Sequence, residues 1–375
     1  AGAAVEEEIV RVALFNVEEL SAGKAAAAGP DGAGSDPQLR AAATIVQRVR
    51  PDVLVLQEVD APPADPAAVA RRFASAYLAT GEAPIDYPYV YAAPVNTGRL
   101  SGFDLDDDGR VATAADTGSR AHGDDSFGFG VYPGQYGMAV LSRHPIDAAA
   151  ARTFRTYPWR ALPGNHLPAR FYSAAEREVM PLSSKSHWDV PVGIAGRTLH
   201  LLVSHPTPPV FDGPEDRNGR RNHDEILFWL HYLDDSGTAD GSAALVDDAG
   251  VAGGLAGDAL FVLAGDLNAD PLRSDTLPAG PPSAVARLLA HPRLRDPGDL
   301  LTSVGGRQTG RGGVAHPERA TAAFNGGMRV DYLLPSRALV PLAGGVFWPA
   351  VDAPERALAD TASDHHLLWL DLRLP

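Results

Sequence analysis

Short apolar stretches recur along the whole chain, and most are continuous rather than alternating with polar residues. They cover residues 9–15, 53–56, 138–141, 199–203, 260–263, 330–334 and 367–372. Each has the length of a strand, and a continuous apolar strand is typical of a sheet that is covered on both faces. The pattern therefore predicts buried β-strands with other layers packed over them.

Two segments between these stretches have the spacing of helices. Their apolar positions are Leu39, Ala42, Val46 and Val49, which precede Pro51, and Ile226, Leu230 and Leu233, which follow Asn222. Intervals of three and four residues place these side chains on one face of a helix. Helices that alternate with buried strands indicate an α/β layered fold.

Two long stretches interrupt this alternation. Residues 94–136 are rich in Gly, Asp and Ser, and residues 234–257 are rich in Gly, Ala and Asp. Because neither stretch has the apolar residues for a core of its own, we interpret both as surface insertions. The chain is then a single domain over residues 1–375.

Composition and charge narrow the function classes. The 375 residues include no cysteine, which excludes disulfides, thiolate nucleophiles and Cys-based zinc sites. A formal net charge of −15 disfavours nonspecific binding to nucleic acid or an anionic membrane. No apolar run reaches the ~18 residues of a membrane span. The start at Ala1 without Met, together with loops rich in Ala, Gly and Pro, leads us to expect a secreted or extracytoplasmic protein.

Polar residues gather where the predicted strands end. In chain order they are Asn16, Gln57-Glu58, Ser204-His205, Asp266-Leu267-Asn268, Asp331 and Asp364-His365. Side chains at one end of a layered sheet form the ligand site in such folds. Oxygen ligands without thiolates suit Mg²⁺, Mn²⁺ or Ca²⁺ better than zinc. With histidines beside them, they indicate hydrolysis of a phosphate ester.

The motifs around these residues resemble the ordered signature of the endonuclease/exonuclease/phosphatase superfamily, the group that includes DNase I. They are Phe15-Asn16-Val17, Leu56-Gln57-Glu58-Val59, 137–143, Ser204-His205, Gly265-Asp266-Leu267-Asn268, 331–334 and Ser363-Asp364-His365. Each motif is weak alone, but their order and their places at strand ends are specific. The resemblance implies a four-layer α/β/β/α sandwich of two mixed sheets.

The same resemblance implies a metal site. Glu58 is the principal metal ligand, Asn16 lies beside it, and Asp364 completes or borders the site. The expected ion is Mg²⁺ or Mn²⁺.

It also implies catalytic roles at the phosphate. Asp266 orients or deprotonates the attacking water, and Asn268 donates a hydrogen bond to a phosphate oxygen. His365, oriented by Asp331, stabilises or protonates the phosphoryl group. His205 corresponds to a second catalytic histidine, either as the acid for the leaving group or as a phosphate ligand.

A separate acidic loop spans residues 104–109. Asp104, Asp106 and Asp108 alternate as in the start of a calcium-binding loop, and Gly109 permits its sharp turn. The twelfth position is Ala115 rather than Glu, so the loop is not an EF-hand. A structural Ca²⁺ site and a solvated acidic loop are both open interpretations.

Four further residues are candidates for substrate binding. Arg220 and Arg221 would clamp a phosphate, or else lie in solvent near the start of a helix that Asn222 caps. Lys185 belongs to a polar run that either lines the cleft or forms an exposed hairpin. Tyr136 precedes the strand that begins at Gly137.

Together these features predict a monomeric, divalent-metal-dependent hydrolase of phosphate esters, whose substrate is a small molecule or a head group. A nonspecific extracellular DNase has the same expected fold, but the acidic charge disfavours it. A catalytically silent binding module is a further alternative. It is disfavoured because the catalytic positions hold the expected residue types.

Overall fold

The computed structural model describes residues 8–234, 245–273 and 283–375. The strands are β1 (Ile9–Leu20), β2 (Val53–Val59), β3 (Tyr89–Tyr91), β4 (Gly137–Ser142), β5 (Arg152–Thr153), β6 (His187–Ile194), β7 (Arg197–Ser204), β8 (Leu260–Asp266), β9 (Asp331–Pro335), β10 (Val340–Val346) and β11 (Leu368–Arg373). The α-helices are α1 (Ala22–Ala26), α2 (Pro37–Val49), α3 (Ala68–Phe73), α4 (Arg120–Asp124), α5 (Ala174–Val179), α6 (Arg217–Leu233), α7 (Ala284–Leu289), α8 (Val304–Thr309) and α9 (Arg356–Ala362).

The strands form two mixed sheets. The first has the order β10-β11-β1-β2-β4-β3, and the second has the order β5-β6-β7-β8-β9. The pairs β1–β2 and β7–β8 are parallel, whereas the other neighbours are antiparallel. Every apolar stretch predicted as a strand lies in one of these strands or begins one residue before it.

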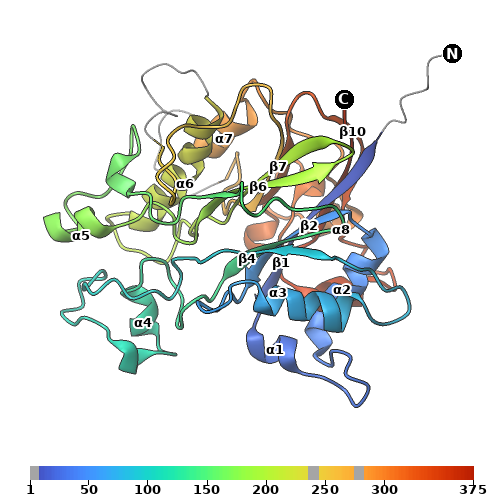
Figure 1. Cartoon of the computed structure of the whole chain (residues 1–375), viewed down its shortest axis with the longest axis horizontal. Coiled ribbons are helices and arrows are strands. Elements are labelled where there is room, and N and C mark those ends of the chain that lie inside the picture. Colours follow the sequence, from blue (N-terminus) through green and yellow to red (C-terminus); the bar gives the residue numbers. More distant parts are fainter. Residues whose placement is uncertain (1–7, 235–244, 274–282) are drawn as a thin grey trace.

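The two sheets pack face to face, and helices cover their outer faces (Figure 1). The central core joins Leu14 and Val55 of the first sheet to Leu201 and Val262 of the second. A second core packs α2 and α3 against the first sheet, and a third packs α6 and α7 against the second. The predicted four-layer α/β/β/α arrangement is therefore confirmed.

Local signals explain where helix α2 begins and ends. The side chain of Asp36 caps the helix by accepting a hydrogen bond from the backbone of Leu39, and Pro37 occupies the first helical position. Arg50 ends the helix in the left-handed conformation with φ of 54°. The apolar face of α2 then packs on β1 and β2.

Helix α6 begins at Arg217, six residues earlier than an Asn222 cap requires. The expected cap is wrong because Asn222 lies inside the helix, fully buried, with its amide bonded to other segments. The start of α6 was predicted too late because its first turns contain polar residues, which an analysis of apolar spacing does not detect.

Two of the longer strands were not predicted, because their sequences carry strand-weakening residues. Strand β6 contains Pro191 and Gly193, and edge strand β10 contains Pro341 and a Gly pair at 344–345. The polar run at 183–189 leads into β6 and is buried throughout, so its interpretation as an exposed hairpin is wrong.

The two predicted insertions contain little regular structure where they are described. Residues 94–136 hold one short α-helix, α4, which lies at the lower left of Figure 1. Of residues 234–257, positions 235–244 lie outside the described part of the chain. Every helix within the described ranges is too short or too polar to serve as a membrane span.

Candidate active site

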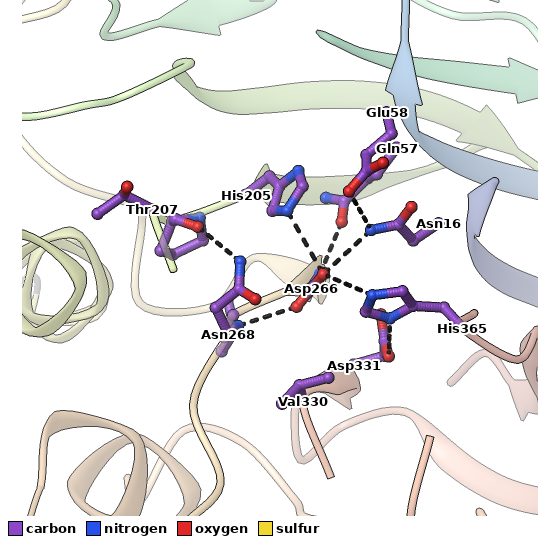
Figure 2. Close-up of polar contacts among 12 residues, drawn as sticks. Asn16, Gln57, Glu58, His205, Thr207, Asp266, Asn268, Val330, Asp331 and His365 are labelled. Carbon is purple, nitrogen blue, oxygen red and sulfur yellow. Dashed lines mark hydrogen bonds and ion pairs between the residues drawn. The ribbon is translucent and has the colours of Figure 1, made fainter. Parts of the chain in front are cut away.

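Residues from both sheets meet at one end of the sandwich (Figure 2). The first sheet contributes Asn16 from β1 and Glu58 from β2, while the second contributes Asp266 from the end of β8 and Asp331 from β9. The segments that follow β7 and precede β11 add the two histidines, His205 and His365. The structure thus brings together the strand-end residues that the sequence singled out.

The buried side chain of Gln57 makes two hydrogen bonds between the sheets at this end. Gln57, on β2, accepts a hydrogen bond from the backbone N–H of Asp266 at 2.7 Å and donates one to the carbonyl of Ser204 at 2.8 Å. The close approach requires Gly265, because a Cβ there would lie 2.1 Å from the Ser204 oxygen. The Gln57 amide therefore fixes the ends of β7 and β8 relative to β2.

Asp266 lies at the centre of the cluster (Figure 2). Its Oδ2 accepts a hydrogen bond from Asn16 Nδ2 at 3.1 Å and lies 3.4 Å from His205 Nε2 and 3.5 Å from His365 Nε2. Its Oδ1 accepts the backbone N–H of Asn268 at 2.9 Å. A carboxylate with donors on both oxygens is held in one orientation.

The second carboxylate, Asp331, orients His365. Its Oδ2 lies 2.9 Å from His365 Nδ1, so the opposite nitrogen, Nε2, faces Asp266. The hydroxyl of Thr321 accepts the backbone N–H of Asp331 at 3.1 Å and helps to position this residue. The ring of His365 is also packed edge-on against Phe324, with 5.7 Å between ring centroids.

Charge and burial set different protonation states for these groups. Burial alone would raise the pKa of Asp266, but the charge of His365 and a hydrogen bond from His205 lower it. Burial opposes the charge on His365, yet Asp331 and Asp266 raise the pKa of its imidazole well above the usual value. Burial lowers the pKa of His205 to about 4. At neutral pH the cluster therefore contains an aspartate, an imidazolium and a neutral imidazole.

Glu58 is aimed into the site by a bulge in β2. The pairing register shifts on both sides of the strand between Gln57 and Val59, and Glu58 has a φ of 59°. Its Oε1 accepts a hydrogen bond from Asn16 Nδ2 at 3.2 Å. Burial raises the pKa of Glu58, while the charge of His365 and the hydrogen bond from Asn16 lower it, so a further cation near Glu58 would favour its charged form.

The donors around Glu58 fit a hard divalent cation. Carboxylates of Glu58 and Asp364 supply oxygen atoms, and the Asp364 side chain is 55% exposed. Asn16 is arranged differently from a metal ligand, because its Oδ1 accepts the backbone N–H of Glu18 while its Nδ2 faces the carboxylates. Asn16 thus meets Glu58 as a hydrogen-bond donor.

Sequence reasoning missed two acidic residues that lie beside Glu58 and Asp364. Glu18 accepts the backbone N–H of Asp364 at 2.9 Å, and the backbone N–H of Glu19 donates to Glu58 at 3.3 Å. Both lie in a bulge of β1 with positive φ, which turns them toward the strand ends. The only sequence signal was the Glu-Glu pair just after Asn16-Val17, which resembles any solvated strand end.

Tyr136 and Lys185 lie near the site. The Tyr136 hydroxyl donates to Glu19 at 3.3 Å, and burial raises the pKa of this phenol to about 12. Lys185 is buried, and burial lowers its pKa against the attraction of Glu225 and of the site carboxylates Glu58 and Asp266. Both residues keep their place as candidates for substrate binding.

The two arginines proposed as a phosphate clamp have structural partners instead. Arg221 is buried and donates to the carbonyls of Pro181, Leu182 and Ser183 at 2.9–3.1 Å. Its assignment to substrate binding is therefore corrected, since these bonds fix α6 to the segment before β6. Arg220 donates to the carbonyl of Glu215, on the loop before α6, and gains no support for a substrate role.

The acidic loop keeps its three predicted carboxylates close together. Ligand atoms of Asp104, Asp106 and Asp108 lie within 4.8 Å of one another. The carboxylate oxygens of Asp104 accept hydrogen bonds from the backbone N–H groups of Asp108 and Gly109. This carboxylate therefore has hydrogen-bond partners within the loop even without an ion. The choice between a Ca²⁺ site and a solvated loop stays open.

Comparison with known proteins identifies the family. The model of the Endonuclease/Exonuclease/phosphatase family matches residues 13–365. A comparison with curated proteins gives no match.

Solved structures of the same family share the fold. An endonuclease/exonuclease/phosphatase from Beutenbergia cavernae is 21% identical, with a TM-score of 0.54 over 98% of this chain and 72% of that one. A family protein from Leptotrichia buccalis is 14% identical, with a TM-score of 0.51 over 97% of this chain and 99% of that one. At these identities the likeness extends to the fold alone.

Replacing Gln57 by Met tests the link between the sheets. The substitution keeps the length of the side chain but leaves the Asp266 N–H and the Ser204 carbonyl unpaired, which should cost about 2 kcal/mol or more of unfolding free energy. It should also lower the turnover of any phosphate ester that the protein hydrolyses. Denaturant unfolding and steady-state kinetics measure the two effects.

Gln47→Met is the matched control. Gln47 is a buried amide on α2 that donates to the carbonyls of Leu78 and Thr80, away from the site. Its loss should reduce stability and leave turnover unchanged. An equal loss of turnover in both variants would contradict a specific role for Gln57.

Calcium binding at the acidic loop is tested by thermal unfolding. If the loop holds Ca²⁺, added Ca²⁺ raises the melting temperature of the wild type in the presence of Mg²⁺, since the ion binds only the folded loop. Asp106→Ala should abolish that rise. No rise in the wild type would contradict the site.

Proposed function

The chain belongs to the endonuclease/exonuclease/phosphatase family, whose members are generally divalent-metal-dependent hydrolases of phosphate esters, and on that premise we propose that it is a phosphoesterase. The observation that carries the proposal is the position of the buried Asp266 carboxylate. It lies between His205 and His365 and accepts a hydrogen bond from Asn16, which also bonds Glu58. The proposed substrate is a small phosphate ester or a phosphorylated head group.

The proposed metal position lies on the first sheet. Glu58 is the principal ligand, with Asp364 beside it. A divalent cation bound there, most simply Mg²⁺ or Mn²⁺, supplies positive charge that offsets the negative charge of the phosphate oxygens.

The catalytic groups lie mainly on the second sheet. Asp266 is ionised near neutral pH because the surrounding donors lower its pKa, so it can orient the attacking water as a hydrogen-bond acceptor and take up its proton only as a weak base. His365, charged and oriented by Asp331, donates a hydrogen bond from Nε2 to a phosphate oxygen. These groups are fixed before substrate binds, which reduces the reorganisation needed in the transition state.

Two further donors complete the proposed phosphate site. Burial lowers the pKa of His205 to about 4, so its ring is neutral at pH 7, and its Nε2 atom, 3.4 Å from Asp266 Oδ2, is the proposed donor to a phosphate oxygen. Asn268 uses one amide N–H on the carbonyl of Pro206, at 2.9 Å, and keeps a second N–H for a phosphate oxygen.

The acidic surroundings favour a small substrate over DNA. Glu18, Glu19 and Asp60 lie around the metal position, and the whole chain carries a net charge of −15. A bound cation neutralises this charge only locally, so an extended polyanion meets repulsion along the rest of its length.

A hydrolysis panel tests the proposal. We expect metal-dependent release from p-nitrophenyl phosphate or bis-p-nitrophenyl phosphate, compared across Mg²⁺, Mn²⁺ and Ca²⁺, with weak dependence on added salt. Plasmid nicking that falls steeply with salt would instead support the DNase alternative. The absence of hydrolysis of all three substrates with every metal would support a silent binding module.

Asp266→Asn tests the central catalytic role. The amide preserves size but cannot accept a proton from water, so we expect turnover to fall at least about 100-fold while the fold is retained. Asp371→Asn is the control, because Asp371 pairs with Arg11 at the opposite end of β1. Turnover of Asp266→Asn near that of the wild type would overturn the assignment.

A further inference from the structure

A second group of side chains of the kinds that can bind a metal lies outside the proposed phosphoesterase site. His223 and Asp224 are neighbours in helix α6, and His166 lies in the loop between residues 159 and 174. Ligand atoms of the three lie within 4.8 Å of one another. The Nδ1 atoms of His166 and His223 lie 2.8 Å and 3.1 Å from the same oxygen, Asp224 Oδ1.

The other oxygen of Asp224 is fixed by the fold. Its Oδ2 accepts the indole N–H of Trp159 at 2.7 Å and the backbone N–H of His166 at 2.6 Å. The Asp224 side chain is fully buried, whereas that of His166 is 37% exposed. The carboxylate is therefore held in place on one side, and the group reaches solvent on the other.

We propose that His166, His223 and Asp224 form a zinc site, with a water molecule as the fourth ligand. Two imidazole nitrogens and a carboxylate oxygen form a donor set that Zn²⁺ accepts, and the solvent-facing side leaves room for the water. The bonds from Trp159 and the His166 backbone to Asp224 are of the kind that orient a metal-bound carboxylate.

The observed distances suit this ion after a small adjustment. Tetrahedral Zn²⁺ at about 2.0–2.1 Å from each ligand separates neighbouring ligand atoms by about 3.3 Å. The two contacts to Asp224 Oδ1, at 2.8 and 3.1 Å, would open by roughly 0.2–0.5 Å. The exposed ring of His166 can make this movement without disturbing the core.

The zinc would join the loop at 159–166 to the helix that supports the catalytic segments. Asn222, two residues before Asp224, donates to the carbonyls of Thr207 and Leu267, both at 2.9 Å. Glu225, the next residue, accepts the backbone N–H of Thr207 at 2.7 Å. The site is distinct from the phosphoesterase centre, and its role is to stabilise this part of the fold.

Zinc titration in the presence of excess Mg²⁺ tests the proposal, because Mg²⁺ competes for the carboxylates proposed as active-site metal ligands and the histidine variants identify which zinc belongs to this site. The metal-free wild-type protein should bind one equivalent of Zn²⁺ and unfold at a higher temperature with it. Added Co²⁺ should give the visible absorption of a tetrahedral nitrogen and oxygen site. His166→Gln and His223→Gln should each weaken Zn²⁺ binding at least about tenfold and lose the Co²⁺ band.

His200→Gln is the matched control, since His200 Nδ1 also pairs with an aspartate oxygen, Asp189 Oδ1, at 2.7 Å. It should retain both zinc binding and the Co²⁺ band. His166 is the more exposed ligand, so His166→Gln should fold like the wild type without metal, as checked by circular dichroism. No zinc binding by the wild type, or equal binding by wild type and His166→Gln, would overturn the proposal.

Discussion

The amide of Gln57 is the contact on which the arrangement of the site depends. Hydrophobic contact is not directional, so apolar packing alone does not fix how the strand ends of two packed sheets are placed relative to each other. Gln57 accepts a hydrogen bond from the Asp266 N–H and donates one to the Ser204 carbonyl, and this pair of bonds fixes the sheet ends relative to each other. Residues whose strands are far apart in the chain then meet to within hydrogen-bonding distance, and a site shared by both sheets becomes rigid.

The charge distribution follows from that geometry. Asp266 is buried but keeps its charge because His365 and His205 face it, and His365 keeps its charge because Asp331 lies behind it. The charge of His365 lowers the pKa of Glu58, but burial raises it by more, so a bound cation would favour the charged form of Glu58. In the proposed function, the metal is held by Glu58 of the first sheet with Asp364 beside it. The groups proposed for proton transfer and phosphate binding are Asp266, His205 and Asn268 at the ends of β7 and β8 in the second sheet, and His365 just before β11.

Much of this was readable from the sequence because strand ends and apolar runs are local features. The continuous apolar stretches located the strands of the central layers, and the motifs around Asn16, Glu58, Asp266 and His365 located the site. Strand β6 was missed because Pro191 and the polar run before it resemble a loop. The bonds of Arg221 to three carbonyls were unpredictable, since they depend on which segments fold against α6. The role of Gln57 in linking the sheets was missed for the same reason. The motif includes Gln57, but it does not show which segments its side chain contacts.

A crystal structure with Mn²⁺ and a non-hydrolysable phosphate ester is the most direct test of the central claim. That claim is that the metal binds at Glu58 while the phosphate binds at Asp266 and the two histidines. We predict an anomalous manganese peak at the Glu58 carboxylate. The phosphorus atom should lie between that ion and the Asp266–His365 pair, with His205 and Asn268 within hydrogen-bonding distance of its oxygens. Manganese bound away from Glu58, or phosphate bound away from Asp266 and both histidines, would contradict the account.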